Sequence, residues 1–189
     1  MKTLHILHTE AATGWGGQEI RIFQECQLLL EQGHQVSIVC QPYSTLWSRC
    51  KSITSPSFTC YVLRMKNPAN LFSILFLYKI IKLAKPDIIH THSSIDSWLA
   101  GVVGKLLGLP VIRSRHISIP IKSFFPNNWL YSKIPKKIIT SGEAISKVVS
   151  SVSGVDPKNI ISISAGVDFK RFDFNIACSD IKKELKINS

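Results

Sequence analysis

The chain has 189 residues, of which 45% are hydrophobic, and a formal net charge of +11. The hydrophobic content is enough for a sizeable core and excludes an intrinsically disordered chain. No stretch reaches the ~18 uncharged apolar residues of a membrane-spanning helix, and the first residues are too polar for a signal peptide. The basic excess predicts acidic partners, which include nucleic acid, anionic lipid headgroups and phosphorylated small molecules.

The spacing of apolar residues predicts strands that alternate with helices. The expected strands are 2–8, 35–40, 58–63, 88–92, 111–115, 137–140 and 160–163. The expected helices are 18–32, 45–51, 68–84, 94–107 and 143–153, with a weak one at 180–186, whereas 116–133 is expected to be irregular. Gly33 and Gly108 are expected to end helices. This alternation predicts an α/β fold, a doubly wound and mostly parallel Rossmann-like sheet with helices on both faces.

The first predicted strand breaks into a segment that holds Gly14, Gly16 and Gly17, and a helical pattern follows. A strand, a glycine loop and a helix in this order are typical of the ligand-binding edge of an open α/β sheet. Glycine adopts backbone conformations barred to other residues and leaves room for a ligand, while the helix N-terminus attracts anions. A plain tight turn is the alternative. We expect no dinucleotide site, because the third glycine and the acidic residue of that fingerprint are missing.

Polar residues follow several predicted strands at their carboxyl ends, where parallel strands meet at one edge of a sheet. They are Gly16, Gly17, His90, Thr91, His92, Ser93, Arg113, Arg115, His116, Ser141 and Glu143. Plain roles remain open for them: His116 as a loop histidine, the two arginines as a solvated basic face, and Glu143 as a charge at a helix N-terminus. Alternatively, the arginines suit a phosphate-bearing ligand.

His90 and His92 lie two positions apart, so a strand would place both side chains on one face, as in a metal site. Zinc usually needs a third ligand, and the sequence places none beside them, so we expect no metal. His5 and His8 are expected to be ordinary strand-end residues. The five cysteines are odd in number and contain no Cys-x-x-Cys spacing, which favours free thiols over a disulfide framework.

Five segments resemble motifs of one known family in order and at plausible spacing. They are 14–19 (GWGGQE), 85–92 (KPDIIHTH), 108–112 (GLPVI) leading to His116, 140–145 (TSGEAI) and 166–172 (GVDFKRF). From residue 1 to about residue 172, the chain is similar to the N-terminal domain of family 4 glycosyltransferases, which have the GT-B architecture. One departure is Ser164-Ala165, where an asparagine commonly precedes the glycine.

The resemblance implies a retaining transfer of a sugar from a nucleotide-sugar donor to a glycan or glycolipid acceptor, with no further cofactor. Gly16 and Gly17 match a loop near the donor phosphates, and His116 matches a histidine close to the transferred sugar. Acceptor contacts are expected from His92, Ser93, Arg113, Arg115, Ser141 and Glu143. Residues 1–172 would form the acceptor-binding domain, and 173–189 would begin a donor-binding domain that the sequence lacks.

The resemblance also implies a cytoplasmic enzyme of glycan or lipopolysaccharide biosynthesis, inactive alone unless a partner chain supplies the donor domain. The aromatic residues and lysines of 122–133 leave open a peripheral contact with an anionic membrane surface, or a loop that packs its aromatics on the sheet. Two alternatives remain: a basic Rossmann-like module for nucleic acid or membrane, and an inactive truncated remnant. We expect no nucleic-acid partner, because the basic residues are dispersed and no RNA-binding or zinc-finger motif occurs.

Overall fold

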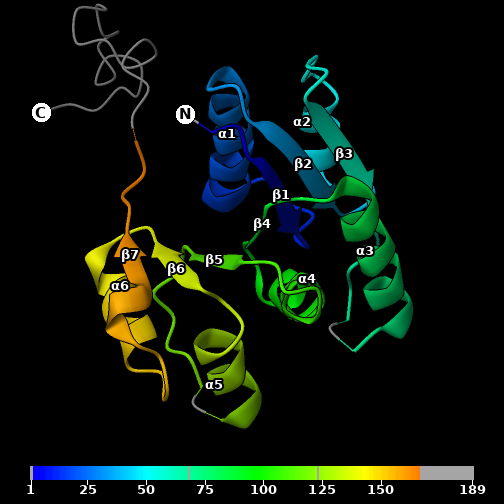
Figure 1. Cartoon of the computed structure of the whole chain (residues 1–189). Coiled ribbons are helices and arrows are strands. Elements are labelled where there is room, and N and C mark those ends of the chain that lie inside the picture. The colour runs from blue at the N-terminus through cyan, green and yellow to red at the C-terminus, as the bar shows by residue number, and fades with distance from the viewer. Residues whose placement is uncertain (1, 68, 123, 167–189) are drawn as a thin grey trace, which may run out of the picture.

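The computed structural model describes residues 2–67, 69–122 and 124–166, which form one parallel seven-stranded sheet with helices on both faces (Figure 1). The strands are β1 (His5–Glu10), β2 (Gln35–Cys40), β3 (Phe58–Val62), β4 (Ile88–Thr91), β5 (Val111–Arg115), β6 (Lys137–Thr140) and β7 (Ile160–Ser162). The helices are α1 (Gly17–Glu31), α2 (Thr45–Cys50), α3 (Leu71–Ala84), α4 (Ser94–Leu106), α5 (Phe125–Ser132) and α6 (Glu143–Ser150), with a 3₁₀ turn at Pro157–Asn159. The predicted doubly wound α/β fold is confirmed.

The strand order β3-β2-β1-β4-β5-β6-β7 reverses its direction of growth between β1 and β4. β2 and β3 are added outward on one side of β1. The chain then returns to β1 and builds β4 to β7 on its other side. At such a switch point the connections that leave neighbouring strands diverge, which opens a crevice at their carboxyl ends. The topology therefore singles out the ends of β1 and β4 as the place for a site.

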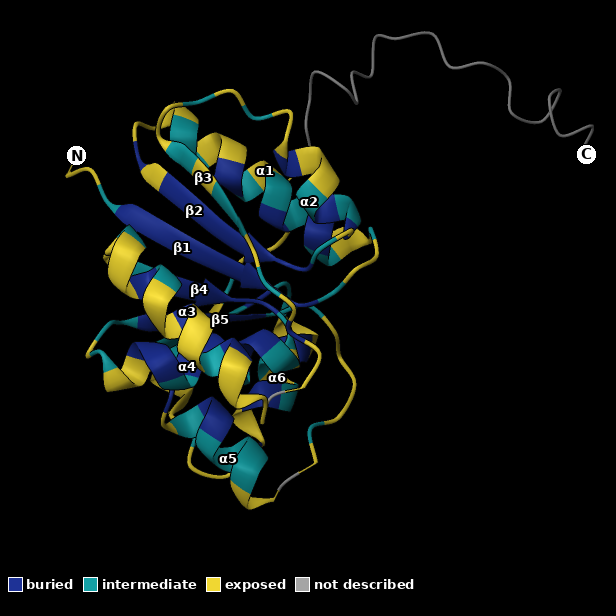
Figure 2. Cartoon of the chain, turned by 90° about the vertical axis from the view of Figure 1, so that its right-hand side faces the viewer, coloured by how far each residue is buried: buried dark blue, intermediate teal, exposed yellow. Residues whose placement is uncertain are grey.

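Two separate hydrophobic cores hold the helices to the sheet. The larger core lies under α3, α4, α5 and α6 and contains Leu7, Leu77, Ile89, Leu99, Leu130, Ile138 and Val149. The smaller core lies under α1 and α2 and contains Ile22, Cys26, Val36, Ile38, Cys40, Leu46 and Cys50. Figure 2 shows α1 and α2 on one side of the strands and α3 and α4 on the other. On the face of the smaller core, α1 approaches β4 through Glu25, which lies 3.4 Å from His90.

Several element boundaries differ from the sequence-based prediction. β1 begins at His5 and runs on to Glu10, because pairing with both β2 and β4 extends the strand. α3 begins at Leu71, since the Asn70 side chain accepts a hydrogen bond from the Ser73 N–H at 3.2 Å and caps the helix there. α6 ends at Ser150. The expected helix at 180–186 and the boundary between 172 and 173 lie outside the described residues.

The prediction of an irregular segment at 116–133 is wrong, because α5 occupies its second half. Pro126 sits in the first turn of α5, where its missing N–H costs nothing. Leu130 and Tyr131 are buried in the larger core, so contacts with the rest of the protein stabilise this short helix. Gly33 and Gly108 have φ of 81° and 69°, which confirms them as residues that end helices.

Candidate functional site

The end of β1 anchors the loop that leads to α1. Glu10 is fully buried, and its carboxyl group accepts hydrogen bonds from the Ala12 N–H at 2.7 Å and the Gln18 side-chain amide at 2.5 Å. Burial, together with the neighbouring carboxyl group of Asp96, raises the pKa of Glu10 to about 8. At neutral pH Glu10 is therefore mostly protonated, and it braces the loop without placing a full charge there.

No glycine of this loop has a backbone conformation that only glycine can adopt. Gly16 has extended backbone angles, φ −122° and ψ −170°, and neither it nor Gly14 or Gly17 has a positive φ. The conformational reason expected for these glycines is therefore wrong. A β-carbon built on Gly17 would meet no atom within 4 Å, so the space beside it is free. The Gly16 N–H is held by the Glu19 carboxylate at 2.7 Å.

Four imidazole rings lie side by side across the switch point. The ring centroids of His8 and His90 are 5.0 Å apart, those of His90 and His92 are 4.2 Å apart, and those of His92 and His116 are 6.1 Å apart. His8 faces His90 because these two residues pair in the register of β1 and β4. Nδ1 of His8 and Nε2 of His92 share a hydrogen bond of 3.1 Å. The sequence pattern anticipated three of these histidines and missed His8.

Three histidines of this row, His8, His92 and His116, are neutral at physiological pH. Burial lowers the pKa of His8 and of His116 to about 4 in each case, and the neighbouring ring of His90 and, at His116, the guanidinium group of Arg21 add to the effect. Burial likewise lowers the pKa of His92 well below its ordinary value. A neutral imidazole offers one N–H donor and one lone pair. His116 can therefore donate to or accept from a ligand hydroxyl, but at neutral pH it is no source of positive charge.

Glu25 of α1 completes the row on its open side. Its Oε1 lies 3.4 Å from Nδ1 of His90, whose Nε2 bonds the Ser114 hydroxyl at 2.8 Å. Burial alone would raise the pKa of Glu25, but its contact with His90, its proximity to His8 and the charge of Arg21 lower it to about 2. Glu25 is thus an ionised carboxylate, and it holds His90 in place from the side of α1.

Asp96 ties the end of β4 to the end of β1. This fully buried carboxyl group accepts hydrogen bonds from the N–H groups of His92 and Ser93, at 2.9 and 2.8 Å, and from the Thr9 hydroxyl at 2.8 Å. The Ser93 hydroxyl donates to it as well. Burial raises its pKa. Ser93 therefore serves first as part of the cap of α4, and Asp96 is a site-building residue that the sequence analysis did not single out.

The two predicted arginines point to the opposite face of the sheet. Arg113 is 3% exposed, and its guanidinium group lies 4.0 Å from the centroid of the Tyr131 ring. Arg113 and Arg115 donate hydrogen bonds to the Tyr131 hydroxyl at 3.0 and 2.7 Å, and Arg115 also bonds the Ile119 carbonyl oxygen. Burial lowers the pKa of Arg113. Both arginines thus connect β5 with α5 and the loop before it, and the structure does not bring them to the histidine row.

After β6 the two predicted residues separate. Ser141 follows the strand directly and is half-buried, and its N–H donates to the Arg115 carbonyl oxygen at 3.3 Å. Glu143 is exposed in the first turn of α6, where a carboxylate suits the positive end of the helix dipole. Ser141 therefore faces the site, whereas the contacts of Glu143 fit its simpler role at the helix terminus.

A groove of about 1230 Å³ runs along this edge, between α1 and the ends of β4 to β7. Its lining includes Gly16, Gly17, Glu25, His90, Ser114, His116 and Ser141. Arg21 of α1 also lines it and donates a hydrogen bond to the Ile163 carbonyl oxygen at 3.1 Å. The groove therefore joins the glycine loop to His116, as expected, while His92 lies beneath it with 4% of its surface exposed.

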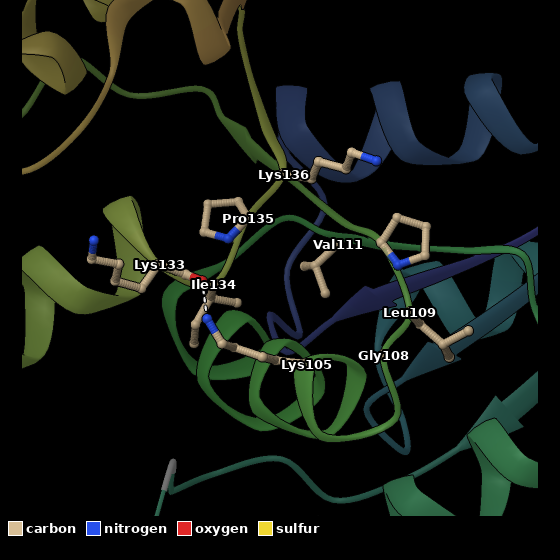
Figure 3. Close-up of a pocket in the computed structure, with 9 residues that line it drawn as sticks. Lys105, Gly108, Leu109, Val111, Lys133, Ile134, Pro135 and Lys136 are labelled. Carbon is tan, nitrogen blue, oxygen red and sulfur yellow. Dashed lines mark hydrogen bonds between the residues drawn. The ribbon is translucent and has the colours of Figure 1, made fainter.

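A second, smaller hollow of about 400 Å³ lies at the opposite end of the strands (Figure 3). It is lined by the start of β5, the segment before β6 and the end of α4, with Lys105, Lys133 and Lys136 around it. The amine of Lys105 bonds the Lys133 carbonyl oxygen and closes one side. This hollow sits at the amino-terminal edge, away from the switch point, so we assign the site to the larger groove.

Comparison with known proteins agrees with this geometry. The family model described as Glycosyltransferase Family 4 matches residues 15–171. The chain belongs to glycosyltransferase family 4. It is 26% identical over 199 residues to an Escherichia coli UDP-Gal:alpha-D-GlcNAc-diphosphoundecaprenol alpha-1,3-galactosyltransferase, and the match covers 98% of this chain and 51% of that protein. The family 4 chain thus spans about half the length of this relative, which is consistent with an N-terminal domain.

Solved structures confirm the fold of the family 4 domain. A glycosyltransferase from Rickettsia africae is 20% identical with a TM-score of 0.78, over 100% of this chain and 51% of that one. Anabaena HepE, solved with UDP and glucose, is 12% identical with a TM-score of 0.73, over 97% of this chain and 50% of that one. A putative UDP-N-acetylglucosamine 2-epimerase from Listeria monocytogenes is 15% identical with a TM-score of 0.62, over 84% of this chain and 44% of that one. The same half-fold therefore also serves epimerases, and the fold alone does not decide the reaction.

Proposed function

We propose that this chain is the acceptor-binding half of a retaining glycosyltransferase, which transfers a hexose from a UDP-sugar to a lipid-diphosphate-linked sugar. One observation supports this most directly: a single groove joins the glycine loop at Gly16 and Gly17 to His116 and Ser141. The Escherichia coli relative acts on a sugar diphosphate of undecaprenol, and HepE was solved with UDP and glucose. A groove of this size accommodates a sugar and its diphosphate together.

Each part of the groove has a proposed task. The free N–H groups at the start of α1, beside Gly17, face the phosphates of the donor. Arg21, one turn further along α1, adds positive charge to the same wall. His116 hydrogen-bonds a hydroxyl of the transferred sugar and Ser141 one of the acceptor, which fixes the two reactants in position. The remaining predicted residues act indirectly, through the capping and packing contacts described above. They are Ser93, Glu143, Arg113 and Arg115.

The donor nucleotide is held mainly by a second domain, outside this chain or on a partner chain. The match covers 51% of the Escherichia coli relative, which leaves room in that protein for such a domain. Alone, the chain binds ligands weakly and does not turn them over. A mixture of the chain with UDP-sugar and acceptor that gave product would contradict this part of the proposal.

The exposed face of α3 is the part that we propose to contact the membrane. It presents Leu71, Phe72, Leu75, Phe76 and Leu83 to the surface, each at least half exposed. Lys79 follows on the same face, with its amine 5.7 Å from the centre of the Phe76 ring, and Lys82 lies in the last turn. Apolar residues beside lysines suit the interface of an anionic bilayer, where they meet acyl chains and headgroups respectively. None of the described helices is both long and apolar enough to cross a membrane.

This placement fits a cytoplasmic enzyme of glycan or lipopolysaccharide biosynthesis that works at a membrane surface. In a flotation assay, the chain should bind vesicles of phosphatidylglycerol and phosphatidylcholine and should release them at high salt. The double variant Phe72→Ser with Phe76→Ser should lower binding at least tenfold, because two exposed aromatic anchors are removed. Tyr43→Ser, at a site 86% exposed near α2, should leave binding unchanged. Equal binding by the double variant would refute this surface.

Ligand binding in the groove is tested with a matched pair of glycine variants. Gly17→Val places a branched side chain in the groove, whereas Gly14→Val adds the same side chain outside its lining. A β-carbon at either position meets nothing within 4 Å, so both variants should fold. UDP or a short-chain polyprenyl diphosphate sugar should shift the amide NMR signals of Gly16 and His116, and Gly17→Val alone should weaken binding about tenfold. Signal shifts confined to the hollow around Lys105 would contradict the proposed site.

A further inference from the structure

We propose that His8, His90 and His92 form a binding site for one divalent transition-metal ion of the zinc class. One ring nitrogen from each of the three lies within 4.8 Å of one ring nitrogen from each of the others. The three side chains are 0%, 3% and 4% exposed, so the cluster is enclosed by protein. The absence of a third ligand was the reason to expect no metal here, and His8 supplies it.

The spacing of the nitrogens is close to what zinc requires. Zinc–nitrogen bonds of about 2.05 Å in a tetrahedral arrangement place the ligand atoms about 3.4 Å apart. Nδ1 of His8 and Nε2 of His92 are already 3.1 Å apart. The widest separation allowed by the cluster exceeds the ideal one by about 1.4 Å, which modest rotations of the three rings can close. Imidazole nitrogen is a ligand that suits zinc and its neighbours in the first transition series.

Without a metal ion, the hydrogen bonding of His8 and His92 is incomplete. Nε2 of His8 and Nδ1 of His92 are buried and have no partner among the described residues. A neutral imidazole has one N–H and one lone pair. Whichever ring donates the shared hydrogen bond, one N–H and one lone pair are therefore left buried and unpaired. An ion bound through Nδ1 of His8 and Nε2 of His92 would replace their shared hydrogen bond and use both lone pairs, with the ring protons then on Nε2 of His8 and Nδ1 of His92.

The surroundings supply negative charge and an entrance. Although the whole chain carries a net charge of +11, the ionised carboxylate of Glu25 lies directly beside the cluster. Glu25 lies 3.4 Å from Nδ1 of His90, in the position of the outer carboxylate that orients many metal-binding histidines, so the ligand atom is Nε2, which the ion would take over from the Ser114 hydroxyl. Glu25 and His90 both line the groove, so an ion can enter from that side and keep one coordination position open to water.

A pair of cysteines could bind the same kind of ion, so the experiment must distinguish binding there from binding at the histidines. The sulfur atoms of Cys40 and Cys60 lie 3.7 Å apart in the smaller core, and thiols bind zinc strongly. Cobalt(II) distinguishes the two, because thiolate ligands add intense sulfur-to-metal charge-transfer bands that nitrogen and oxygen ligands lack. The proposed site should give d–d bands of a low-symmetry complex without those charge-transfer bands.

The test uses the full chain after treatment with a chelator, dialysed against zinc chloride and analysed for bound metal. We expect one zinc ion per chain. His8→Asn and His92→Asn should each weaken binding at least tenfold, since each removes one ligand. His5→Asn is the matched control: His5 is a buried histidine on the same strand, bonded to Ser37 at 2.9 Å and outside the cluster. It should bind zinc like the unaltered chain.

A readout on the unaltered chain protects the test against variants that fail to fold. Zinc should shift the ring ¹⁵N resonances of His8, His90 and His92 and leave those of His34, at the far end of β1, in place. Substoichiometric zinc, unchanged affinity in both cluster variants, thiolate bands with cobalt, or ring shifts confined to other histidines would each overturn the proposal.

Discussion

Replacing Glu10 by glutamine should abolish one specific pH dependence of stability. Glu10 has a pKa of about 8 in the folded chain against 4.5 as its reference value. Because the folded-state pKa is raised, the stabilisation linked to protonated Glu10 is fully present below pH 4.5. It is then lost as the pH rises through 8, since the folded state holds a proton that the unfolded state has released.

The size of this effect follows from the two pKa values. Each unit of pH between them removes about 1.4 kcal/mol from the free energy of unfolding. From pH 6 to pH 9 the loss from Glu10 alone is about 2.5 kcal/mol. Glu10→Gln keeps the shape of the protonated side chain and cannot ionise, so its stability should not show this loss. At pH 6 the variant should be close to the unaltered chain, because both accept the bond from Ala12 and Gln18 can turn its amide oxygen towards the new side-chain NH2 group.

Urea unfolding followed by circular dichroism at pH 6, 7.5 and 9 measures the difference. The two stability curves should diverge by about 2.5 kcal/mol towards pH 9. Glu143→Gln, which alters an exposed carboxylate, should follow the unaltered chain throughout. Parallel curves for Glu10→Gln and the unaltered chain would show that Glu10 is ionised in the fold. The claim that a protonated Glu10 supports the glycine loop would then be wrong.

Three further substitutions test the packing around the site. Gly104→Ala should destabilise by about 1–3 kcal/mol, because the added carbon would lie 2.8 Å from side-chain atoms of Ile89 and of Val111. Asn70→Ala should cost about 1 kcal/mol through loss of the cap of α3, measured by thermal unfolding. Tyr131→Phe should cost about 2–4 kcal/mol in urea unfolding, because two buried guanidinium groups lose a hydrogen-bond acceptor.

Matched controls make these outcomes decisive. Gly142→Ala adds a carbon where nothing lies within 4 Å and should change stability little, so equal effects at both glycines would contradict the packing argument. Asn70→Asp keeps a capping oxygen and should retain the stability that alanine loses. Tyr61→Phe removes a hydroxyl at the border of the larger core, and no hydrogen bond of that hydroxyl occurs in the described chain. If it costs as much as Tyr131→Phe, the arginine contacts are not the cause.

The sequence was a sufficient guide wherever the signal is local. Alternating strands and helices, and glycines such as Gly33 at helix ends, follow from short-range patterns and were predicted correctly. α5 was missed because its proline and polar residues carry no helical signal of their own, and burial of Leu130 and Tyr131 supplies the stability. Tertiary contacts of this kind override local propensity.

The residues of the candidate site also fall into those that the sequence predicted and those that it did not. Convergence of the glycine loop and His116 follows from the general geometry of parallel sheets and was predicted. Arg113 and Arg115 were expected at the ligand edge beside His116, but the two-residue period of a strand puts both on the side of Val111 and away from Ser114, where they contact Tyr131. His8 could not be recognised, because its partnership depends on the register of β1 against β4. That register is set by residues more than eighty positions apart.

The pairing of β1 with β4 also determines when the site can form during folding. His8 and His92 are 84 positions apart in the chain, and Thr9 and Asp96 are 87 apart. Contacts with such long sequence separation require closure of a large loop, so they form late and slowly during folding. A nascent chain that has completed β1, β2 and β3 possesses three paired strands and the glycine loop, yet no binding edge. Any opening that detaches β4 from β1 therefore removes the histidine row, because His8 and His90 belong to these two strands.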